Sequence, residues 1–552
     1  MRALILTSAS LVLAASCAAG TGFLSGPEEE PSVYGAFLAG RYASVARDVD
    51  RSAEFYAQAL EIEPGLDILS ERAFYAALMA GDFARADEAA HQAVEQSSDL
   101  EFARIYARAA ALEEGERLTL PDEGEPGPFG RVIEDMLADW EQARTRAGAR
   151  QAAGQTLEIP SQAAPYAIVH KALIFEAAGE WSRAEDAYTA ASQDGDLADF
   201  VTVLHGSFLE RRGRWAEAIA LYQARIASDE NPDPGVTAAL ERAREGRRPS
   251  RLTPADGAAR SLYALSRMLV QSAPGDYTAL FLRLVQRLDP DLARNRYTLA
   301  QTLEALGMVE EAIALYDGLA GTPFGVDARV DAAWLLFVAG ERERAVERAE
   351  TLRDETMDAS ARLLLADIYR LSERCAEAVE VYDAVMQTGA DARWQPHYYK
   401  GICHQTLGDW PAAEFHFVRA LEIAPNEPRL LNHLGYNWIV FGERVEEGLA
   451  MVQRAAALAP DNGAILDSVG WGLFKLGRYE EAVDWLERAV ERSPGDPTIN
   501  WHLGDAYART GRDLQARFQW EHALGLDPDA REEALIRERL ERGLEAARAD
   551  LE

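Results

Sequence analysis

Apolar residues recur every three to four positions along most of this chain, and short polar turns interrupt the spacing. This period places apolar side chains on one face of an α-helix. The clearest example predicts a first helix from Ala464 to Leu476 and a second helix from Tyr479 to Ser493, which Pro494 ends because proline has no amide donor. On the second helix, Ala482 and Ala489 are predicted to lie on one face.

Landmarks of this helix pair recur 34 residues further along the chain. The recurring pairs are Gly470 and Gly504, Ala482 and Ala516, Ala489 and Ala523, and Pro494 and Pro528. So short a helical hairpin leaves an apolar face that only the next hairpin covers, so the unit implies a stack. We therefore predict an all-α fold, a superhelical solenoid of antiparallel helix pairs.

Small residues at fixed places in the repeat are predicted to let paired helices approach closely. A glycine inside a helix costs about 1 kcal/mol relative to alanine, and close contact with the paired helix would offset that cost. The predicted packing residues are Gly401, Ala413, Gly435, Gly470, Ala482, Ala489, Gly504, Ala516 and Ala523.

The repeat pattern also divides the chain into segments. We predict a signal peptide at 1–17, a flexible tether at 18–33, N-terminal repeats at 34–112, a loop at 113–130, repeat-like helices at 131–226, a linker at 227–257, a C-terminal repeat array at 258–528 and a capping helix at 529–552. Proline and glycine content assigns the loop and the linker, and one short helix is expected inside the linker, around Val236 to Arg244. The last segment has the sparse apolar pattern expected of a solenoid cap.

The first seventeen residues have the pattern of an export signal. Arg2 precedes an apolar run, and the small residues Ala14, Ala15 and Ser16 precede Cys17. Small residues followed by cysteine resemble the lipobox of bacterial lipoproteins, in which the cysteine becomes the lipidated N-terminus. The alternative is ordinary signal cleavage nearby, with Cys17 incidental. In either case we expect an exported, periplasmic protein. The lipobox resemblance implies a lipid anchor at the outer membrane, because Ala18 replaces the aspartate that commonly retains bacterial lipoproteins at the inner membrane.

The charge of the chain limits its partners. Asp and Glu number 91 against 56 Lys and Arg, a formal net charge of −35. Nucleic acids and anionic membrane surfaces both require a cationic protein face. We expect no nucleic-acid partner, and contact with a membrane only through an N-terminal lipid.

The 34-residue landmarks resemble tetratricopeptide (TPR) repeats over nearly the whole chain after residue 33. More narrowly, the runs 431–436, 467–471 and 496–505 resemble a bacterial family of exported repeat proteins. Val469 and Trp501 depart from the residues usual in that family. Members often carry a lipoprotein signal, and some are similar to adaptors that bring substrates to periplasmic carboxyl-terminal processing proteases. The resemblance implies protein partners, among them an envelope protease or its substrates.

Motifs for catalysis or metal binding are missing from the sequence. No HExxH, GxSxG, GxGxxG or GxxxxGK run is present. His397 and His404 lie seven residues apart on one predicted helix, about 10 Å by helical rise, too far to chelate one ion alone. Cys375 and Cys403 are either buried free thiols or a disulfide, which export would permit. We expect no enzyme activity, no metal site and no cofactor.

Two functions remain open. One is a protein-binding scaffold or adaptor that holds a peptide or helix in its concave groove, and the other is a structural or self-assembling envelope component. The oligomeric state is open as well. The predicted groove residues are Tyr398, Asn432, Tyr436, Asp467, Trp471, Phe474, Trp501, Asp505 and Arg509. The alternative for the two tryptophans is that they fill the core between repeats.

Overall fold

The structure is a computed structural model. It describes residues 32–95, 100–118, 127–155, 163–193, 195–229, 232–272, 275–355, 359–387, 393–442 and 444–543. These residues form 29 α-helices and no strand, in two compact units. Unit 1 ends at Asn295 and unit 2 begins at Arg296, so the boundary falls inside one helix.

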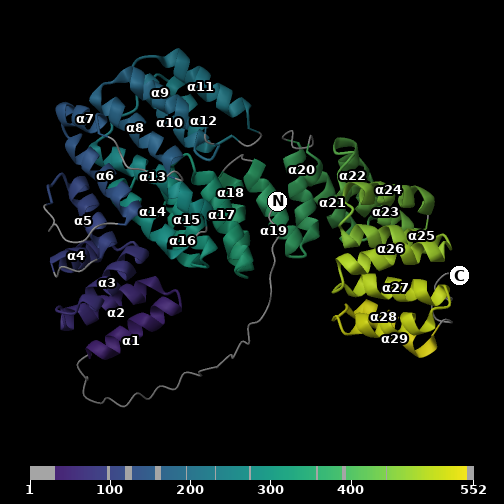
Figure 1. Ribbon diagram of the computed structural model, residues 1–552. Helices are drawn as coiled ribbons and strands as arrows, with labels where there is room; N and C mark the ends of the chain where they lie inside the picture. Colours follow the sequence, from purple (N-terminus) through teal and green to yellow (C-terminus); the bar gives the residue numbers. More distant parts are fainter. Residues whose placement is uncertain are drawn as a thin grey trace. The chain divides into compact units, whose positions relative to one another are not determined.

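Unit 1 contains fourteen complete helices (Figure 1). They are α1 (Val33–Val45), α2 (Val49–Ile62), α3 (Asp67–Ala80), α4 (Phe83–Glu95), α5 (Glu101–Glu114), α6 (Pro128–Gln142), α7 (Arg146–Ala153), α8 (Ala164–Ala178), α9 (Trp181–Ala191), α10 (Ala198–Arg211), α11 (Trp215–Ala227), α12 (Pro234–Arg244), α13 (Pro254–Ser272) and α14 (Asp276–Leu288).

The boundary helix α15 (Ala293–Ala305) leads into unit 2. There follow α16 (Val309–Asp317), α17 (Gly325–Val338), α18 (Arg342–Glu355), α19 (Ala359–Leu371), α20 (Cys375–Met386), α21 (Trp394–Thr406), α22 (Trp410–Ile423), α23 (Pro428–Phe441), α24 (Val445–Leu458), α25 (Gly463–Lys475), α26 (Tyr479–Arg492), α27 (Pro497–Arg509), α28 (Asp513–Leu524) and α29 (Ala530–Arg542).

Side-chain caps and turns fix where the helices of the repeats begin and end. The Asp496 carboxylate caps α27 by accepting from the amide of Ile499, and Pro497 occupies the first turn. The turn between α25 and α26 needs a left-handed residue, and Gly477 supplies it with a φ of 75°. A capping box of Asp529 and Glu532 starts α29.

Unit 2 is a stack in which each helix packs on the next. Paired helices such as α23 with α24 and α25 with α26 make the most extensive contacts, and the first helices of successive pairs also touch, as α23 touches α25 and α25 touches α27. The predicted all-α solenoid of antiparallel helix pairs is confirmed.

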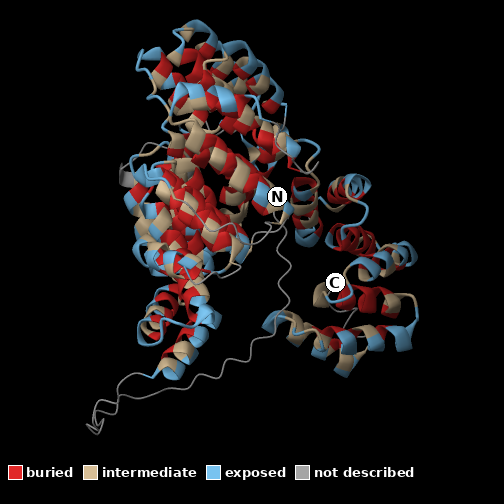
Figure 2. Ribbon diagram, turned by 60° about the vertical axis from the view of Figure 1, so that its left-hand side comes forward, coloured by how far each residue is buried: buried red, intermediate tan, exposed pale blue. Residues whose placement is uncertain are grey.

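Unit 1 departs from a simple stack because its last two helices turn back along the chain. Helix α13 packs on α5, α6 and α8, and α14 packs on α3 and α5 (Figure 1). Their apolar side chains are buried, including Leu262 and Leu265 on α13 and Phe281, Leu284 and Val285 on α14. In the ribbon coloured by burial, buried residues lie on the faces where helices meet (Figure 2). The returning pair therefore forms the centre of unit 1.

Charged contacts join α14 to helices far away in the sequence. The Arg287 guanidinium donates to Asp87 at 3.2 Å, to Glu113 at 2.6 Å and to Glu114 at 2.6 Å. The Tyr106 hydroxyl donates to the same Asp87 carboxylate at 2.6 Å. Arg287 thus ties α14 to α4 and α5.

The predicted linker at 227–257 and the predicted single array at 258–528 differ from the structure. The short helix expected around Val236 to Arg244 within the linker range is α12, and its buried face of Val236, Ala239 and Ala243 packs on α10 and α11, so these residues belong to the helix stack rather than to a free linker. Helices α13 and α14 belong to unit 1 rather than to the later array. The local pattern identifies these residues as helical, but their packing partners lie up to about two hundred residues earlier in the chain.

Other predicted boundaries meet the edges of the described residues. The predicted signal peptide, Cys17 and most of the tether lie outside them, and α1 begins at Val33. Helix α5 ends at Glu114 and α6 begins at Pro128, so both helices reach into the predicted loop at 113–130, of which 119–126 lie outside the described residues. The predicted cap corresponds to α29, with 544–552 outside.

Candidate protein-binding surfaces

The small residues of the repeat lie where paired helices cross. A Cβ atom built on Gly470 would stand 2.5 Å from Leu486 Cγ, and one built on Gly504 would stand 2.5 Å from Trp520 Cδ1. A Cβ on Gly401 would meet the ring of Phe417 at 2.6 Å, and one on Gly435 would meet the Gly448 carbonyl at 2.8 Å. The alanines that share this role are fully buried, namely Ala413, Ala482, Ala489, Ala516 and Ala523.

Most of the predicted groove residues are covered by neighbouring repeats. Trp471 and Trp501 retain 6% and 8% of their surface and belong to the hydrophobic core. Tyr398, Asp467, Phe474 and Asp505 are also buried, whereas Asn432, Tyr436 and Arg509 are half-buried. The expectation that the two tryptophans are open to a partner is therefore wrong for this structure, because successive first helices pack through these same positions.

An imidazole that the sequence analysis missed organises this part of the core. The His502 ring stacks on Trp471 with centroids 3.9 Å apart and meets Trp501 edge-on at 4.1 Å. Its Nδ1 atom lies 2.8 Å from the Asp467 carboxylate. Each position belongs to a first helix, so the cluster joins α25 to α27.

A second buried group joins α27 to the last two helices. The Arg539 guanidinium donates to Asp505 at 2.6 Å, and the Trp520 indole N–H donates to the same carboxylate at 3.0 Å. Burial raises the pKa of the Asp505 carboxyl, while Arg539 opposes that rise. This pairing satisfies Asp505 inside the protein, so the residue is not available to a ligand.

Histidines gather on α21, α22 and α23. His397 Nδ1 and His416 Nδ1 lie 3.1 Å apart, and His433 Nε2 lies 3.0 Å from the Gln405 side-chain oxygen. Burial lowers the pKa of His416 to about 4, with nearby Lys400 adding to the effect, and burial lowers the pKa of His433 to about 4. Both rings are therefore neutral at pH 7.

The two cysteines of unit 2 are buried free thiols. Burial and the neighbouring Cys375 thiol raise the pKa of Cys403. A protonated, enclosed thiol is a weak nucleophile and a weak metal ligand. Within the described part of the chain, no three His, Cys, Asp or Glu side chains converge as a metal-ligand set.

Unit 1 contains a buried polar chain with the residue types of a hydrolase triad. His170 Nε2 lies 3.1 Å from the Asp139 carboxylate, and His170 Nδ1 lies 3.1 Å from the Ser261 hydroxyl, which also accepts from the Trp140 indole at 3.1 Å. All three triad-like residues are completely buried. A substrate has no path to the hydroxyl, so the group holds α13 against α6 and α8. No sequence motif marked it.

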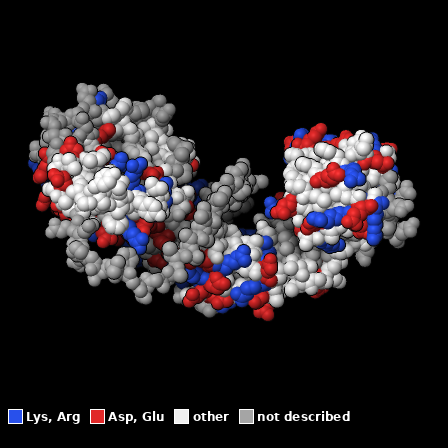
Figure 3. Space-filling model, turned by 90° about the horizontal axis from the view of Figure 1, so that it is seen from below, with Lys and Arg blue, Asp and Glu red and all other residues white. Residues whose placement is uncertain are grey.

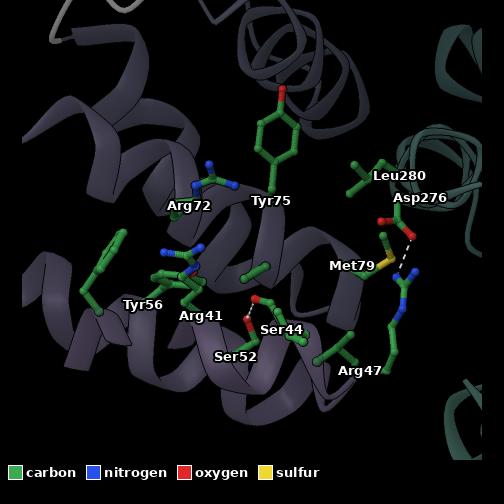
Figure 4. Close-up of a pocket in the computed structure, with 14 residues that line it drawn as sticks. Arg41, Ser44, Arg47, Ser52, Tyr56, Arg72, Tyr75, Met79, Asp276 and Leu280 are labelled. Carbon is green, nitrogen blue, oxygen red and sulfur yellow. Dashed lines mark hydrogen bonds and ion pairs between the residues drawn. The ribbon is translucent and has the colours of Figure 1, made fainter. Parts of the chain in front are cut away.

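An open cavity lies at the N-terminal end of unit 1. It has a volume of about 730 Å³ and lies between α1, α2, α3 and the start of α14 (Figure 4). Its lining includes the rings of Phe37, Tyr56 and Tyr75 and the thioether of Met79, of which Tyr56 and Met79 are largely buried. Phe37 and Tyr56 meet edge to face at 5.7 Å. The sequence analysis did not predict this cavity, since residues more than two hundred positions apart enclose it.

Polar groups also face this cavity. The Ser44 and Ser52 hydroxyls lie 2.6 Å apart, and the Arg47 guanidinium donates to the Asp276 carboxylate at 2.6 Å, joining the α1–α2 turn to α14 (Figure 4). Arg41 on α1 and Arg72 on α3 complete the charged lining. Aromatic and cationic groups in one concavity suit recognition of another molecule.

The charges elsewhere are mixed. On the face seen in Figure 3, basic and acidic side chains are interspersed over the described surface rather than gathered into one basic area. None of the described helices combines the length and apolarity needed to cross a membrane.

Family models match three parts of the chain. Two models described as tetratricopeptide repeat match residues 204–234 in unit 1 and 330–393 in unit 2, and one described as TPR repeat matches 472–511. These matches coincide with helix pairs of the stack. The chain therefore contains TPR repeats in these three ranges.

Curated relatives share only part of this chain. A TPR repeat-containing protein of Pseudomonas aeruginosa is 29% identical over 178 residues, which cover 31% of this chain and 29% of that protein. The human aspartyl/asparaginyl beta-hydroxylase is 25% identical over 209 residues, which cover 35% of this chain and 27% of that protein. The chain thus spans less than a third of the length of each.

Solved structures match this chain at low sequence identity and low TM-score. The TPR protein YrrB, whose description notes an unusual peptide-binding site, is 20% identical, with a TM-score of 0.28, and the match covers 34% of this chain and 94% of that one. The Cut9–Hcn1 hetero-tetramer of the APC/C matches at 15% identity and a TM-score of 0.39, over 92% of this chain and 95% of that one.

Proposed function

We propose that this protein is a non-enzymatic scaffold of the bacterial cell envelope that holds a segment of a partner protein in the cavity of unit 1. The cavity carries the proposal. Its volume of about 730 Å³ falls within the roughly 300–1,000 Å³ typical of binding pockets. Its rings bury apolar partner side chains, and its arginines and hydroxyls orient the partner backbone and charges.

A scaffold role agrees with the interior of both units. The buried His170 and Asp139 in unit 1, and the buried Asp467 and His502 in unit 2, are partnered inside the protein. A binding function does not require a solvent-filled site with paired acid and base groups. In unit 2, Trp471 and Trp501 pack inside the hydrophobic core between successive first helices, so they do not face a partner.

The envelope location is part of the proposal and is supported by the sequence of residues 1–17 and by the resemblance to exported lipoprotein repeat families. A lipid on Cys17 would hold the scaffold at the periplasmic face of the outer membrane. An envelope protease or one of its substrates fits this location as partner.

Site-specific photo-crosslinking tests the binding role. A photoreactive phenylalanine analogue in place of Tyr75 is expected to give one discrete crosslinked product in cells, identifiable by mass spectrometry. The same analogue in place of Leu514, 85% exposed in unit 2, is the control. Filling the cavity with Met79→Trp must remove the Tyr75 product. Identical products from both positions, or a product that survives Met79→Trp, would show that the cavity does not hold the partner.

A further inference from the structure

We infer that the cavity of unit 1 selects an acidic peptide segment, whose carboxylates are bound by Arg41 and Arg72 together. The inference rests on the proposed function and specifies the chemical character of the partner segment. It follows from the charges that face the cavity, from their lack of partners, and from the rings beside them.

Cationic groups outnumber anionic ones in the cavity lining. Arg41, Arg47 and Arg72 face it with Asp276 as the single carboxylate among the lining residues. Arg47 and Asp276 neutralise each other through their 2.6 Å ion pair. Two guanidinium charges, one on α1 and one on α3, therefore remain uncompensated in the lining (Figure 4).

Neither Arg41 nor Arg72 makes an ion pair or a hydrogen bond with the residues that the structure describes. Several other arginines of this protein pair with carboxylates. Arg214 pairs with both Glu185 and Glu217, and Arg287 pairs with Asp87, Glu113 and Glu114. In a chain with a net charge of −35, carboxylates are abundant, so two arginines left unpaired in one cavity indicate a site for an external anion.

The surroundings favour a peptide over a small inorganic anion. Phe37, Tyr56 and Tyr75 line the same cavity, and Met79 adds a flexible thioether. Guanidinium groups bind carboxylates through two parallel hydrogen bonds, and the neighbouring rings offer apolar surface to the side chains beside the carboxylates. A segment that alternates acidic and apolar side chains satisfies both parts of the lining.

The rest of the molecule disfavours the other common polyanions. A nucleic acid or an anionic membrane spreads negative charge over a long surface, which the excess of 35 acidic residues repels. A short acidic segment places its charge only inside the cavity. Of the anionic macromolecules, a protein segment is thus the occupant that the charges favour.

Binding of defined peptides to the full mature chain tests the inference. The probes are a fluorescent, amidated octapeptide of alternating glutamate and phenylalanine, the same peptide with glutamine for glutamate, and the glutamine peptide with a free C-terminal carboxylate. We expect the glutamate peptide to bind at least tenfold more tightly than the amidated glutamine peptide. If the glutamine peptide with a free C-terminal carboxylate also binds tightly, one of the two arginines binds the C-terminal carboxylate of the peptide.

Variants connect the binding to the two arginines. Arg41→Gln with Arg72→Gln is expected to weaken the glutamate peptide at least tenfold and to flatten the dependence of affinity on salt. Arg85→Gln is the matched control, because Arg85 is an exposed arginine on α4 that pairs with Asp82. Both side chains in the double variant are exposed, and an unchanged thermal melt verifies that it folds.

Three outcomes overturn the inference. They are equal binding of the amidated glutamate and glutamine peptides, unchanged binding by the double variant, and arginine-dependent binding of phosphatidylglycerol vesicles in place of peptide. If equal binding of both peptides is abolished by Met79→Trp, the cavity is a peptide site without acidic preference, and the proposed function survives.

Discussion

Gly470 and Leu486 meet where α25 crosses α26, and the crossing leaves no space for a side chain on the glycine. Gly495 offers a contrast in the same unit, since a Cβ atom built there meets nothing within 4 Å and its φ is not in the left-handed region. The two glycines therefore differ in packing while sharing their chemistry.

We expect Gly470→Val to lower the free energy of unfolding by about 1–3 kcal/mol, because it forces Leu486 and the α26 backbone away from α25. Gly495→Val is expected to stay within about 0.5 kcal/mol of the wild type. Guanidinium unfolding followed by circular dichroism measures both. Equal stability of the two variants would mean that the helices do not cross at Gly470.

Trp471 is the residue whose role sequence reasoning and structure assign differently. Trp471→Ala is expected to cost about 3–5 kcal/mol, because the substitution removes the stack on His502 and leaves a cavity in the core. A nearly unchanged melting temperature together with lost partner binding would restore the groove assignment. Trp485, partly buried at the edge of the same core and substituted in the same way, is the comparison and should cost less.

The pattern could identify Gly470, Ala482 and Trp471 as repeat positions but could not separate groove from core. That separation depends on how tightly successive first helices approach, which is set by all the side chains between them. His502 carried no motif, and only its contacts with Asp467 and two tryptophans identify its role.

Between helices, buried neutral imidazoles make the α21 to α23 segment sensitive to acid. The pKa of His433 is lowered to about 4 from an unfolded value near 6.5, so the unfolded chain binds the extra proton between these values. Stability is therefore complete above about pH 6.5 and falls as the pH drops toward 4, and His416 acts in the same direction.

His433→Gln is expected to reduce the pH dependence of unit 2 stability between pH 6.5 and 4 by up to one proton, about 1.4 kcal/mol per pH unit. The measurement is denaturant unfolding at a series of pH values. The wild-type slope, measured over the same pH range, is the reference. A slope unaltered by His433→Gln would show that this ring is protonated in the folded protein.

The returning pair α13 and α14 shows what the local pattern cannot provide. The helical spacing of 258–288 is legible in sequence, and the helices form as that spacing requires. Their partners α3, α5, α6 and α8 precede them by about a hundred to two hundred residues, and no repeat landmark records that contact. The same distance explains why the cavity of unit 1 was not predicted.

Arg287→Ala is expected to destabilise unit 1 by about 2–3 kcal/mol, since the side chain is 11% exposed and its loss leaves two glutamates without their ion pair and Asp87 with only the Tyr106 hydroxyl. The glutamates are partly exposed, so the cost is below that of a fully buried pair. Arg348→Ala, which breaks a more exposed pair with Asp317 in unit 2, should cost under about 1 kcal/mol. Equal losses of stability for the two variants in thermal unfolding would show that Arg287 does not hold α14 against α4 and α5.

For the whole molecule, the proposed lipid on Cys17 predicts where the protein is found in the cell. Cys17→Ser is expected to move the chain from the outer-membrane fraction to the soluble periplasmic fraction, with Cys403→Ser as the control that stays with the membrane. A wild-type protein that is already soluble, with no change on substitution, would reject the anchor while leaving the scaffold role intact.

Because α14 packs on α3, the core of unit 1 cannot form until α14 has been synthesised. Roughly two hundred residues separate the end of α3 at Ala80 from the start of α14 at Asp276. At about 5–20 residues per second, the ribosome needs on the order of 10–40 s to deliver α14 after α3 has emerged. Throughout that interval the apolar faces that α14 will cover are exposed. A nascent unit 1 is therefore a natural client for a holding chaperone, whereas each helix pair of unit 2 meets its neighbour within seconds.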